Sequence, residues 1–555
     1  MKVLRKILPL LIILVLLPIL SLTAYAYSDI DGSHWANEMI TQMQQSGVLT
    51  EITDDSGNFY PNAAITRGDF ITLIIKTCAA DANGDLSGME DLALVSEEIK
   101  PYLGAAQNLG IFKGTIKDGK VYAEADSKIF RQDAATILGR LLKLSSTEAN
   151  GFTDQADVSV YAKTYVTALT AKSIIKGYSD NSFKPKAHIT RAEAVSLAKY
   201  AKTYCDLNKN QLTTLCGLGS VNALDGTLAK AAFGQPQGLT ADKAGNIYIF
   251  DTDNSLVRKI SGEKVSTVAG LAKYRDAYGD VIGSYVDGHI SAAYLHKPTD
   301  GVILTNGDLL FADQAANAIR CISGSAVYTY SGDEMPGYAE GAAEKARYNS
   351  PSSVAVDDKG NLYVADTLNH CIRVIDKNRN SSLLAGTPQK SGFADGNAKE
   401  TLFNEPTGIA VSADGSTVFV SDSGNQRIRM IKDGKVITYA GSGAEKDSVS
   451  GYIIGGYYDG AAAKAQFLFP RGLYLTANGL LLVADRGNNV IRAITTDGKV
   501  MTIAGNGDAD CISGTALSAS LNGPTDISLI GDKLYITDTN NNAIRILTFN
   551  PDMLK

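Results

Sequence analysis

Six aspartates, each followed seven residues later by an arginine, are the most regular set of ionisable residues in this 555-residue chain. A guanidinium at that spacing can pair with the carboxylate across a short turn. Six nearly identical pairs are expected to brace six equivalent structural units, because catalysis needs one special site rather than six alike. The pairs are Asp251–Arg258, Asp313–Arg320, Asp366–Arg373, Asp422–Arg429, Asp485–Arg492 and Asp538–Arg545.

A proline precedes each of these aspartates by 14 to 16 residues, and the polar residues beside the prolines differ between copies. We predict that four of these variable residues contact a ligand: His296, Asp300, Arg471 and Asp526. No cofactor is predicted, although Asp300 and Asp526 offer the oxygen ligands that a calcium ion accepts.

The elements that position these residues are short strands. Apolar residues alternate within each copy and are bounded by Gly, Asn and Asp, which is typical of strands and tight turns. Four strands per copy and six copies predict a six-bladed β-propeller spanning residues 211–549. The last copy lacks its fourth strand, and we expect residues 211–217 to supply it and close the ring.

Two of the connections between copies, residues 271–286 and 442–458, are longer than the others. They follow the first and fourth copies and should face each other across the ring. Tyrosine in irregular loops on a rigid scaffold is suited to binding, although packing against neighbouring blades is an equally good interpretation. The predicted contacts are Tyr274, Tyr278, Tyr285, Tyr452, Tyr457 and Tyr458.

Three features together resemble the NHL repeat family: the Pro-x-Gly/Ser/Asp opening, the Gly-Asn-Ile-Tyr type of second strand, and the Asp-x-x-Asn turn before Ile-Arg. The resemblance implies a propeller that serves as a binding platform or, less often, as a lyase or lactonase. An enzyme of that kind needs convergent metal ligands, and the few histidines of the ring are not expected to converge.

Residues 27–204 carry a different repeat, with helical periodicity and a length near 62 residues. The copies are expected at 27–86, 87–150 and 151–204, each with two amphipathic helices, and a linker is expected at 205–210. Thr66 with Asp69 and Thr190 with Glu193 form capping boxes that open the second helix of the first and third copies. The fold class is therefore multidomain, an all-α trio of helical motifs followed by an all-β propeller.

The His34-Trp35-Ala36 run, the Phe59-x-Pro61 and Phe183-x-Pro185 motifs, and the Ile-Thr-Arg motifs at 65–67 and 189–191 resemble the S-layer homology family. The resemblance implies non-covalent binding of secondary cell-wall polysaccharide. Arginine pairs with ketal carboxylates, and an aromatic face covers a sugar ring. The middle copy is degenerate, and there we expect packing rather than binding. The implied binding residues are Asp29, Asp91, Asp154, Trp35, Arg67, Arg131 and Arg191.

The first 26 residues predict a secretory signal peptide, with basic residues before an apolar run and a small-residue cleavage site. Its removal leaves 49 of the 52 basic residues against 59 acidic ones, a net charge of −10. That charge argues against nucleic-acid binding, and no transmembrane segment is expected after signal removal. The six cysteines show no CxxC spacing, so neither a metal site nor a disulfide scaffold is predicted.

The predicted protein is secreted and anchored to the cell wall, in the surface layer. Its partners are secondary cell-wall polysaccharide and an unidentified protein or glycan held by the propeller. Two alternatives stay open. The propeller can be a metal-dependent lactonase or lyase, or the whole protein can be an architectural component of a surface layer.

Overall fold

The computed structural model describes residues 27–49, 57–78, 84, 86–147, 151–172, 174–276 and 281–554. The predicted signal peptide at 1–26 lies outside these residues. Two compact units are distinguished, one made of residues up to Phe130 together with 187–199, the other of 131–186 and residues from Tyr200 onward. Among the described residues, none of the helices combines the length and the hydrophobicity that crossing a bilayer requires.

The N-terminal repeats form two helices each in the described part of the chain. These helices are α1 (Asn37–Gln45), α2 (Arg67–Cys78), α3 (Lys100–Asn108), α4 (Arg131–Leu141), α5 (Val160–Ala171) and α6 (Arg191–Lys209). The predicted capping box of α6 is present, because the Thr190 and Glu193 side chains each accept a hydrogen bond from the other's backbone N–H.

Two sequence predictions need correction in this region. The middle copy contains an antiparallel hairpin, β1 (Thr115–Lys117) and β2 (Lys120–Tyr122), so the region is not all-α. Its Asp118-Gly119 turn has positive φ at both residues, the geometry that favours two-residue hairpins. The linker expected at 205–210 is also absent, because α6 continues to Lys209 and buries Leu207 in an apolar cluster of the propeller.

Three equivalent isoleucines join the helical copies through a closed set of backbone hydrogen bonds. The Ile65 N–H donates to the Ile189 carbonyl at 3.1 Å, Ile189 to Ile129 at 3.3 Å, and Ile129 to Ile65 at 3.2 Å. Each isoleucine is buried. The three copies are therefore tied together at the residues just before their second helices.

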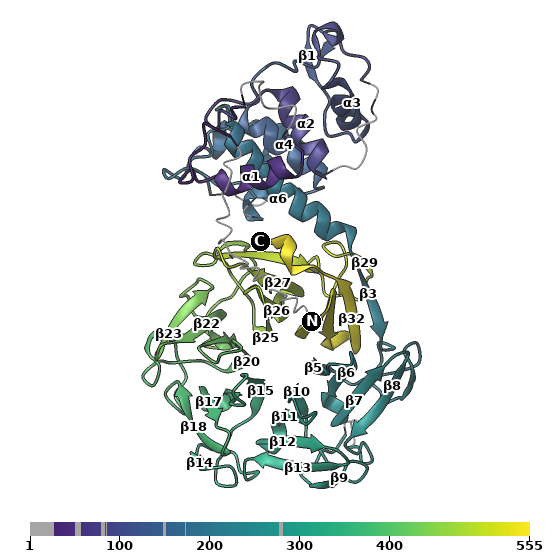
Figure 1. Ribbon diagram of the computed structural model, residues 1–555, viewed down its shortest axis with the longest axis vertical. Coiled ribbons are helices and arrows are strands. Elements are labelled where there is room, and N and C mark those ends of the chain that lie inside the picture. The colour runs from purple at the N-terminus through teal and green to yellow at the C-terminus, as the bar shows by residue number, and fades with distance from the viewer. Residues whose placement is uncertain are drawn as a thin grey trace, which may run out of the picture. The chain divides into compact units, whose positions relative to one another are not determined.

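The C-terminal repeats form six five-stranded sheets arranged around an axis (Figure 1). The first blade has β4 (Gly226–Thr227), β5 (Pro236–Ala241), β6 (Ile247–Asp251), β7 (Leu256–Ser261) and β8 (Lys264–Ala269). The second has β9 (Gly288–His289), β10 (Pro298–Ile303), β11 (Leu309–Asp313), β12 (Ala318–Ser323) and β13 (Ala326–Ser331). The third has β14 (Gly341–Ala342), β15 (Pro351–Val356), β16 (Leu362–Asp366), β17 (Cys371–Ile375) and β18 (Asn380–Ala385).

The fourth, fifth and sixth blades repeat this arrangement. The fourth has β19 (Gly396–Asn397), β20 (Pro406–Val411), β21 (Thr417–Asp422), β22 (Arg427–Lys432) and β23 (Lys435–Ala440). The fifth has β24 (Gly460–Ala461), β25 (Pro470–Leu475), β26 (Leu481–Asp485), β27 (Val490–Ile494) and β28 (Lys499–Ala504). The sixth has β29 (Gly514–Thr515), β30 (Pro524–Ile530), β31 (Lys533–Asp538), β32 (Ala543–Thr548) and the N-terminal strand β3 (Gln211–Cys216).

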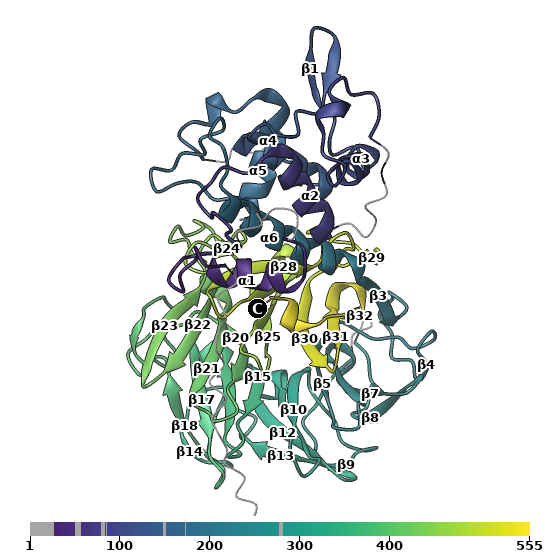
Figure 2. The ribbon, with the colours of Figure 1, turned by 45° about the horizontal axis from the view of Figure 1, so that its top comes forward.

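The ring closes as the sequence predicts. β3 pairs antiparallel with β32, with Leu212 opposite Leu547 and Thr214 opposite Arg545. The teal β3 lies beside the yellow β32 in both views of the ribbon (Figure 2). Leu212 is fully buried. The first strand of the propeller thus completes its last sheet, which leaves neither an unpaired start nor an unpaired end.

A fifth, two-residue strand at the outer edge of each blade was not predicted. This short strand pairs with the fourth strand, as Gly226 does with Val265. It begins at a glycine in every blade: Gly226, Gly288, Gly341, Gly396, Gly460 or Gly514. Five of these six glycines have φ between 117° and 151°. That backbone region suits glycine, which explains why this residue recurs at the position.

Neighbouring blades are joined by a side-chain latch. In each blade a short 3-10 turn follows the repeated aspartate, and the residue just after this turn has left-handed φ. Its side chain accepts a hydrogen bond from the backbone N–H of the residue that precedes the proline of the next blade. The six acceptors are Ser255, Asn317, His370, Gln426, Asn489 and Asn542. The latches align the first strands of the six blades, which begin at the prolines and surround the central channel of the ring.

Candidate functional sites

The repeated Asp–Arg pairs are buried structural ion pairs. All twelve side chains are inaccessible to solvent, and the Arg–Asp distances lie between 2.6 and 3.2 Å. Each aspartate also accepts a backbone N–H before the blade's proline, as Asp251 does from Gly234 at 2.6 Å. Burial raises the pKa of Asp251, Asp313, Asp366 and Asp485 to about 6, while the paired arginine acts in the opposite direction.

Two of the predicted loop tyrosines belong to this same framework. The Arg320 guanidinium lies 4.6 Å from the ring of Tyr285, and Arg492 lies 5.1 Å from that of Tyr457. Their hydroxyls bond to Thr329 and Thr502 at 2.5 and 2.8 Å. Tyr338 and Phe393 cover Arg373 and Arg429 in the same way, so this aromatic position is a repeated packing feature.

The remaining tyrosines differ in how accessible they are. Tyr274 is 54% exposed. The Tyr452 hydroxyl donates to Glu405 Oε1 at 2.8 Å, and its ring meets that of Phe469 edge-on at 5.7 Å. Tyr458 is half-buried, and its carbonyl accepts a hydrogen bond from Arg492. Tyr278 lies outside the described residues.

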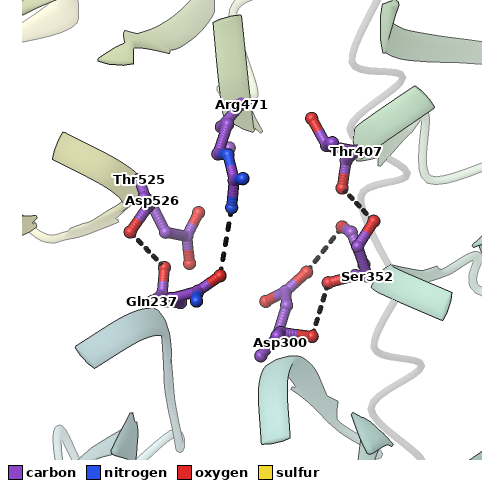
Figure 3. A pocket seen from close by; sticks show the side chains of 11 residues that line it. Gln237, Asp300, Ser352, Thr407, Arg471, Thr525 and Asp526 are labelled. Atoms are coloured by element: carbon purple, nitrogen blue, oxygen red, sulfur yellow. Dashed lines mark hydrogen bonds between the residues drawn. The ribbon is translucent and has the colours of Figure 1, made fainter. Parts of the chain in front are cut away.

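A small pocket, partly open to solvent, lies where the first strands of the six blades begin. Figure 3 shows Gln237, Asp300, Ser352, Thr407, Arg471, Thr525 and Asp526 around it. The structure therefore brings three of the predicted residues together: Asp300, Arg471 and Asp526. His296 is not part of the lining. It is half-buried, and burial and Lys297 lower its pKa.

Hydroxyl groups link adjacent strands around the pocket. Three of them donate to the carbonyl of the equivalent residue in the next blade, whereas Thr407 reaches the Pro470 carbonyl at 3.4 Å. Thr299 donates to Ser352 at 2.9 Å, Ser352 to Thr407 at 2.8 Å, and Thr525 to Gln237 at 2.7 Å. Gln237 and Arg471 interrupt this series. Instead, Arg471 Nη1 reaches Gln237 Oε1 at 3.0 Å (Figure 3).

Two carboxyl groups form a second layer of the lining. Asp300 Oδ2 accepts a hydrogen bond from the Ser353 hydroxyl at 2.6 Å, and Asp526 Oδ2 accepts one from the Leu239 N–H at 2.9 Å. Burial raises the pKa of Asp300 to about 6. Burial together with the charge of Asp300 raises the pKa of Asp526 well above its usual range. The described residues contain no group of three or more His, Cys, Asp or Glu placed to hold a metal ion.

Arg486 and Gln237 were missed by the sequence analysis. Arg486 begins the 3-10 turn after Asp485, and its charge, with burial, lowers the pKa of Arg471 to about 10. The sequence itself could have drawn attention to Arg486. The residue after the repeated aspartate is Thr, Gln or Ser in the other five copies, and Arg at 486 is the only charged one.

In the helical repeats, the three predicted aspartates close equivalent loops. Each carboxylate accepts two consecutive backbone N–H groups: Asp29 from Phe59 and Tyr60, Asp91 from Ala123 and Glu124, Asp154 from Phe183 and Lys184. The second donor of each loop has left-handed φ. These carboxylates therefore fix the backbone conformation of the three loops.

The three predicted arginines each contact the loop of another copy. Arg67 pairs with Glu124 at 3.1 Å, and Glu124 is also paired with Lys117. The Arg131 guanidinium lies 4.8 Å from the Tyr178 ring and donates from Nε to the Phe183 carbonyl at 2.9 Å. Arg191 lies 5.2 Å from the Phe59 ring. Each arginine therefore lies against a loop of a different copy, a contact that was not predicted.

Aromatic residues accompany the loops of the first and third copies, exposed in the first and half-buried in the third. Trp35 is 60% exposed and stacks on His34 with ring centroids 5.8 Å apart, and Tyr60 is 44% exposed. The Lys184 ammonium lies 4.2 Å from the Tyr178 ring. The equivalent of Tyr60 and Lys184 in the middle copy is Glu124, which carries the opposite charge to Lys184 and pairs with Arg67.

Comparisons with known proteins agree with these two architectures. The family model of the S-layer homology domain matches residues 26–71 and 151–195, and that of the NHL repeat matches residues 348–375. The chain is similar to Protein SUPPRESSOR OF QUENCHING 1, chloroplastic, of Arabidopsis thaliana. The two are 28% identical over 302 residues, covering 50% of this chain and 27% of that protein.

It is also similar to the Surface-layer 125 kDa protein of Lysinibacillus sphaericus, with 26% identity over 144 residues. That match covers 26% of this chain and 12% of the relative, so the chain spans only a small part of either relative. A solved structure of a protein of unknown function from Bacteroides thetaiotaomicron aligns with a TM-score of 0.46 and 20% identity, covering 61% of this chain and 76% of that one. The chain thus carries two S-layer homology regions and a six-bladed propeller with an NHL repeat, a combination that indicates association with the cell surface.

Proposed function

We propose that residues 27–204 hold the protein non-covalently on secondary cell-wall polysaccharide, and that the propeller is displayed there as a binding module. The observation that carries the first part is the repeated placement of an arginine against a loop of another copy, with exposed aromatic side chains beside the loop of Asp29 and the half-buried Tyr178 beside the loop of Asp154. A guanidinium recognises carboxylate groups, and an aromatic face covers a sugar ring.

The three loops are not equivalent as binding sites. At the loop closed by Asp154, the cations Arg131 and Lys184 both lie against the Tyr178 ring. At the loop closed by Asp29, Arg191 lies against Phe59, and Tyr60 is exposed. At the loop closed by Asp91, Glu124 already supplies a carboxylate to Arg67. We therefore assign polysaccharide binding to the loops closed by Asp29 and Asp154, in the first and third copies.

Sedimentation with purified Gram-positive wall sacculi tests this assignment. The secreted protein should sediment with intact sacculi and stay in solution after hydrofluoric acid has removed the secondary polysaccharide. Trp35→Ala should weaken sedimentation, because it removes the most exposed aromatic face of the first copy. Equal sedimentation with stripped and intact sacculi would refute polysaccharide anchoring.

Val160→Ala provides the matched control. Val160 is an apolar side chain of the same helical region and is 85% exposed, so its removal changes exposed apolar area without touching a loop. If Val160→Ala weakens sedimentation as much as Trp35→Ala does, the loss reflects a general surface effect and the assignment of Trp35 is wrong.

For the propeller, the support for a binding role comes from the channel pocket and the loops around its mouth. A long loop packs against His296 through Gly283, and the other places Tyr452 on Glu405, which precedes the first strand of the fourth blade. Immobilised propeller-containing protein should retain a protein or glycan from a surface extract. Failure to retain any component would contradict the binding role while leaving wall anchoring untouched.

A further inference from the structure

The fifth blade differs from the other five at two positions beside the channel. The residue after the first-strand proline is Arg471 in this blade and Gln, Thr or Ser in the others. The residue after the repeated aspartate is Arg486 in this blade and Thr, Gln or Ser in the others. Two guanidinium groups are therefore concentrated on one side of a channel whose equivalent positions are uncharged.

Arg486 is not among the residues that line the pocket, and its place beside the channel strands follows from its counterparts. In three other blades the equivalent hydroxyl donates at 2.7 or 2.8 Å to the carbonyl of the proline that starts the next channel strand: Thr252 to Pro298, Thr367 to Pro406, Thr539 to Pro236. Ser423 donates to Pro470 in the same way. Arg486 cannot reproduce this short link.

Neither Arg471 nor Arg486 forms an ion pair with an acid among the described residues, although Asp300 and Asp526 line the same pocket as Arg471. Arg486 Nε is buried and has no hydrogen-bond partner among the described residues. Arg471 Nη1 donates to the neutral amide of Gln237. The acid near this pair, Glu405, accepts the Tyr452 hydroxyl, and its charge raises the pKa of Arg471 less than burial and Arg486 lower it. A buried donor without an acceptor and two like charges together favour an incoming anion.

The rest of the lining indicates what else the ligand carries. Besides Arg471, it consists of Ser and Thr hydroxyls, the Gln237 amide, two glycines and the carboxyl groups of Asp300 and Asp526, with no apolar side chain. Ligand pockets are usually dominated by apolar residues. A lining without them suits a ligand with many hydroxyl groups.

We propose that the channel mouth binds a sugar bearing a carboxylate or phosphate group. The anionic group pairs with Arg471 and Arg486, and the sugar hydroxyls bond to Asp300, Asp526 and the hydroxyl groups between them. This inference rests on the binding role proposed for the propeller and names the chemistry of its ligand.

Calorimetric titration of the full secreted protein tests the site with four probes: glucuronate, glucose 6-phosphate, glucose and glucosamine. One of the two anionic sugars should bind at least about tenfold more tightly than neutral glucose, because charge-assisted hydrogen bonds are stronger than neutral ones. The tighter of the two anions identifies carboxylate or phosphate as the preferred group. Absence of binding by both anions, equal binding of glucose, or tighter binding of the glucosamine cation would overturn the proposal.

The variants exploit the repeat itself. Arg471→Thr installs the residue found at the equivalent position in three other blades, and Arg486→Thr installs the hydroxyl that links blades elsewhere. Both should keep or raise the melting temperature while lowering affinity for the preferred anion about tenfold. Arg347→Thr, which removes an arginine paired with Asp333 at the surface, should leave affinity unchanged. Wild-type affinity in Arg471→Thr and Arg486→Thr would reject the assigned residues.

Retention of a surface-extract component by the same protein shows whether only the anion site is wrong or the binding role of the propeller is wrong as well. If that component is retained but neither anionic sugar binds, the anion site is wrong and the binding role of the propeller stands. If nothing is retained and no sugar binds, both are wrong.

Discussion

The helical repeats and the propeller both arrange copies of one motif around a centre, but they use their repeated arginines differently. In the propeller all six arginines are fully buried and meet the same partner, an aspartate seven residues earlier. In the helical repeats three arginines lie partly exposed and meet three different partners: a carboxylate, a tyrosine ring and a phenylalanine ring. Repeated residues with one environment hold the fold, whereas those with diverged environments are the candidates for binding.

The same distinction applies within the propeller. The Asp–Arg pairs do not vary, while the residues after the channel prolines change from Gln to Thr, Ser and Arg. Positions that vary between otherwise equivalent blades gather in one pocket. Divergence among internal copies is therefore a more useful guide to function here than the most regular pattern.

The largest effect is expected from breaking a buried pair. Arg320→Ala removes the partner of fully buried Asp313 and should lower the free energy of unfolding by about 3–5 kcal/mol. Arg347→Ala, at a partly exposed pair, should cost no more than about 1 kcal/mol. Urea unfolding followed by circular dichroism measures both, and equal losses would remove the structural distinction drawn between the two kinds of arginine.

A slightly smaller loss is expected from weakening the closing strand. Leu212→Ala leaves a cavity between β3 and the rest of the sixth blade and should destabilise the protein by about 2–4 kcal/mol. Leu218, just after this strand, is 52% exposed, and Leu218→Ala should have almost no effect. The same urea titrations compare them. A neutral Leu212→Ala would mean that the strand is not needed for closure.

A substitution in the middle helical copy should strengthen binding to the wall rather than weaken it. Glu124→Gln removes the carboxylate that occupies Arg67, so affinity for intact sacculi should rise about threefold, the scale of one partly exposed ion pair. Glu98 is an exposed acid of the same copy, and Glu98→Gln controls for the change in net charge. A rise of equal size with both variants would show that charge alone is responsible.

The smallest expected effect is a pH dependence of the channel. The pKa of Asp300 is raised to about 6, so this group is ionised at about pH 8 and mostly protonated at about pH 5.5. His296 and His370, whose pKa values are lowered by burial, can only add positive charge on acidification. Asp526 is held protonated more strongly, and Arg471 and Arg486 stay charged.

Loss of one negative charge from the pocket that Arg471 lines should therefore strengthen glucuronate binding severalfold between about pH 8 and about pH 5.5, since glucuronate itself stays ionised over that range. Calorimetry at the two pH values measures the change. Asp300→Asn should abolish most of it. Weaker binding at the lower pH would contradict the arrangement of charges described for the pocket.

The propeller was largely predictable because its pattern is periodic. The Pro, Asp and Arg spacing gave the strands, and the missing fourth strand of the last copy pointed to residues 211–217. The latches could not be predicted, because Ser255, Asn317, His370 and Gln426 share only a backbone conformation and not a side-chain type. Tyr285 and Tyr457 were interpreted as loop residues, although each lies two positions before an acid, Asp287 or Asp459, just as Tyr338 and Phe393 lie before Glu340 and Asp395.

The helical repeats were predictable as elements but less so as sites. Helix positions followed from periodicity and capping. Sequence spacing could not show that Arg67, Arg131 and Arg191 reach across to another copy, since that depends on how the copies are joined at Ile65, Ile129 and Ile189. The short hairpin went unnoticed because each strand has only three residues, too few to show alternation.

One sedimentation experiment with intact sacculi tests the division of roles most directly. It compares the wild-type protein with two double variants, Trp35→Ala with Arg191→Gln in the helical region, and Arg471→Thr with Arg486→Thr in the propeller. Our account predicts that the helical double variant stays in solution, while the propeller double variant sediments like the wild type. Loss of sedimentation in the propeller variant, with retention in the helical variant, would contradict it.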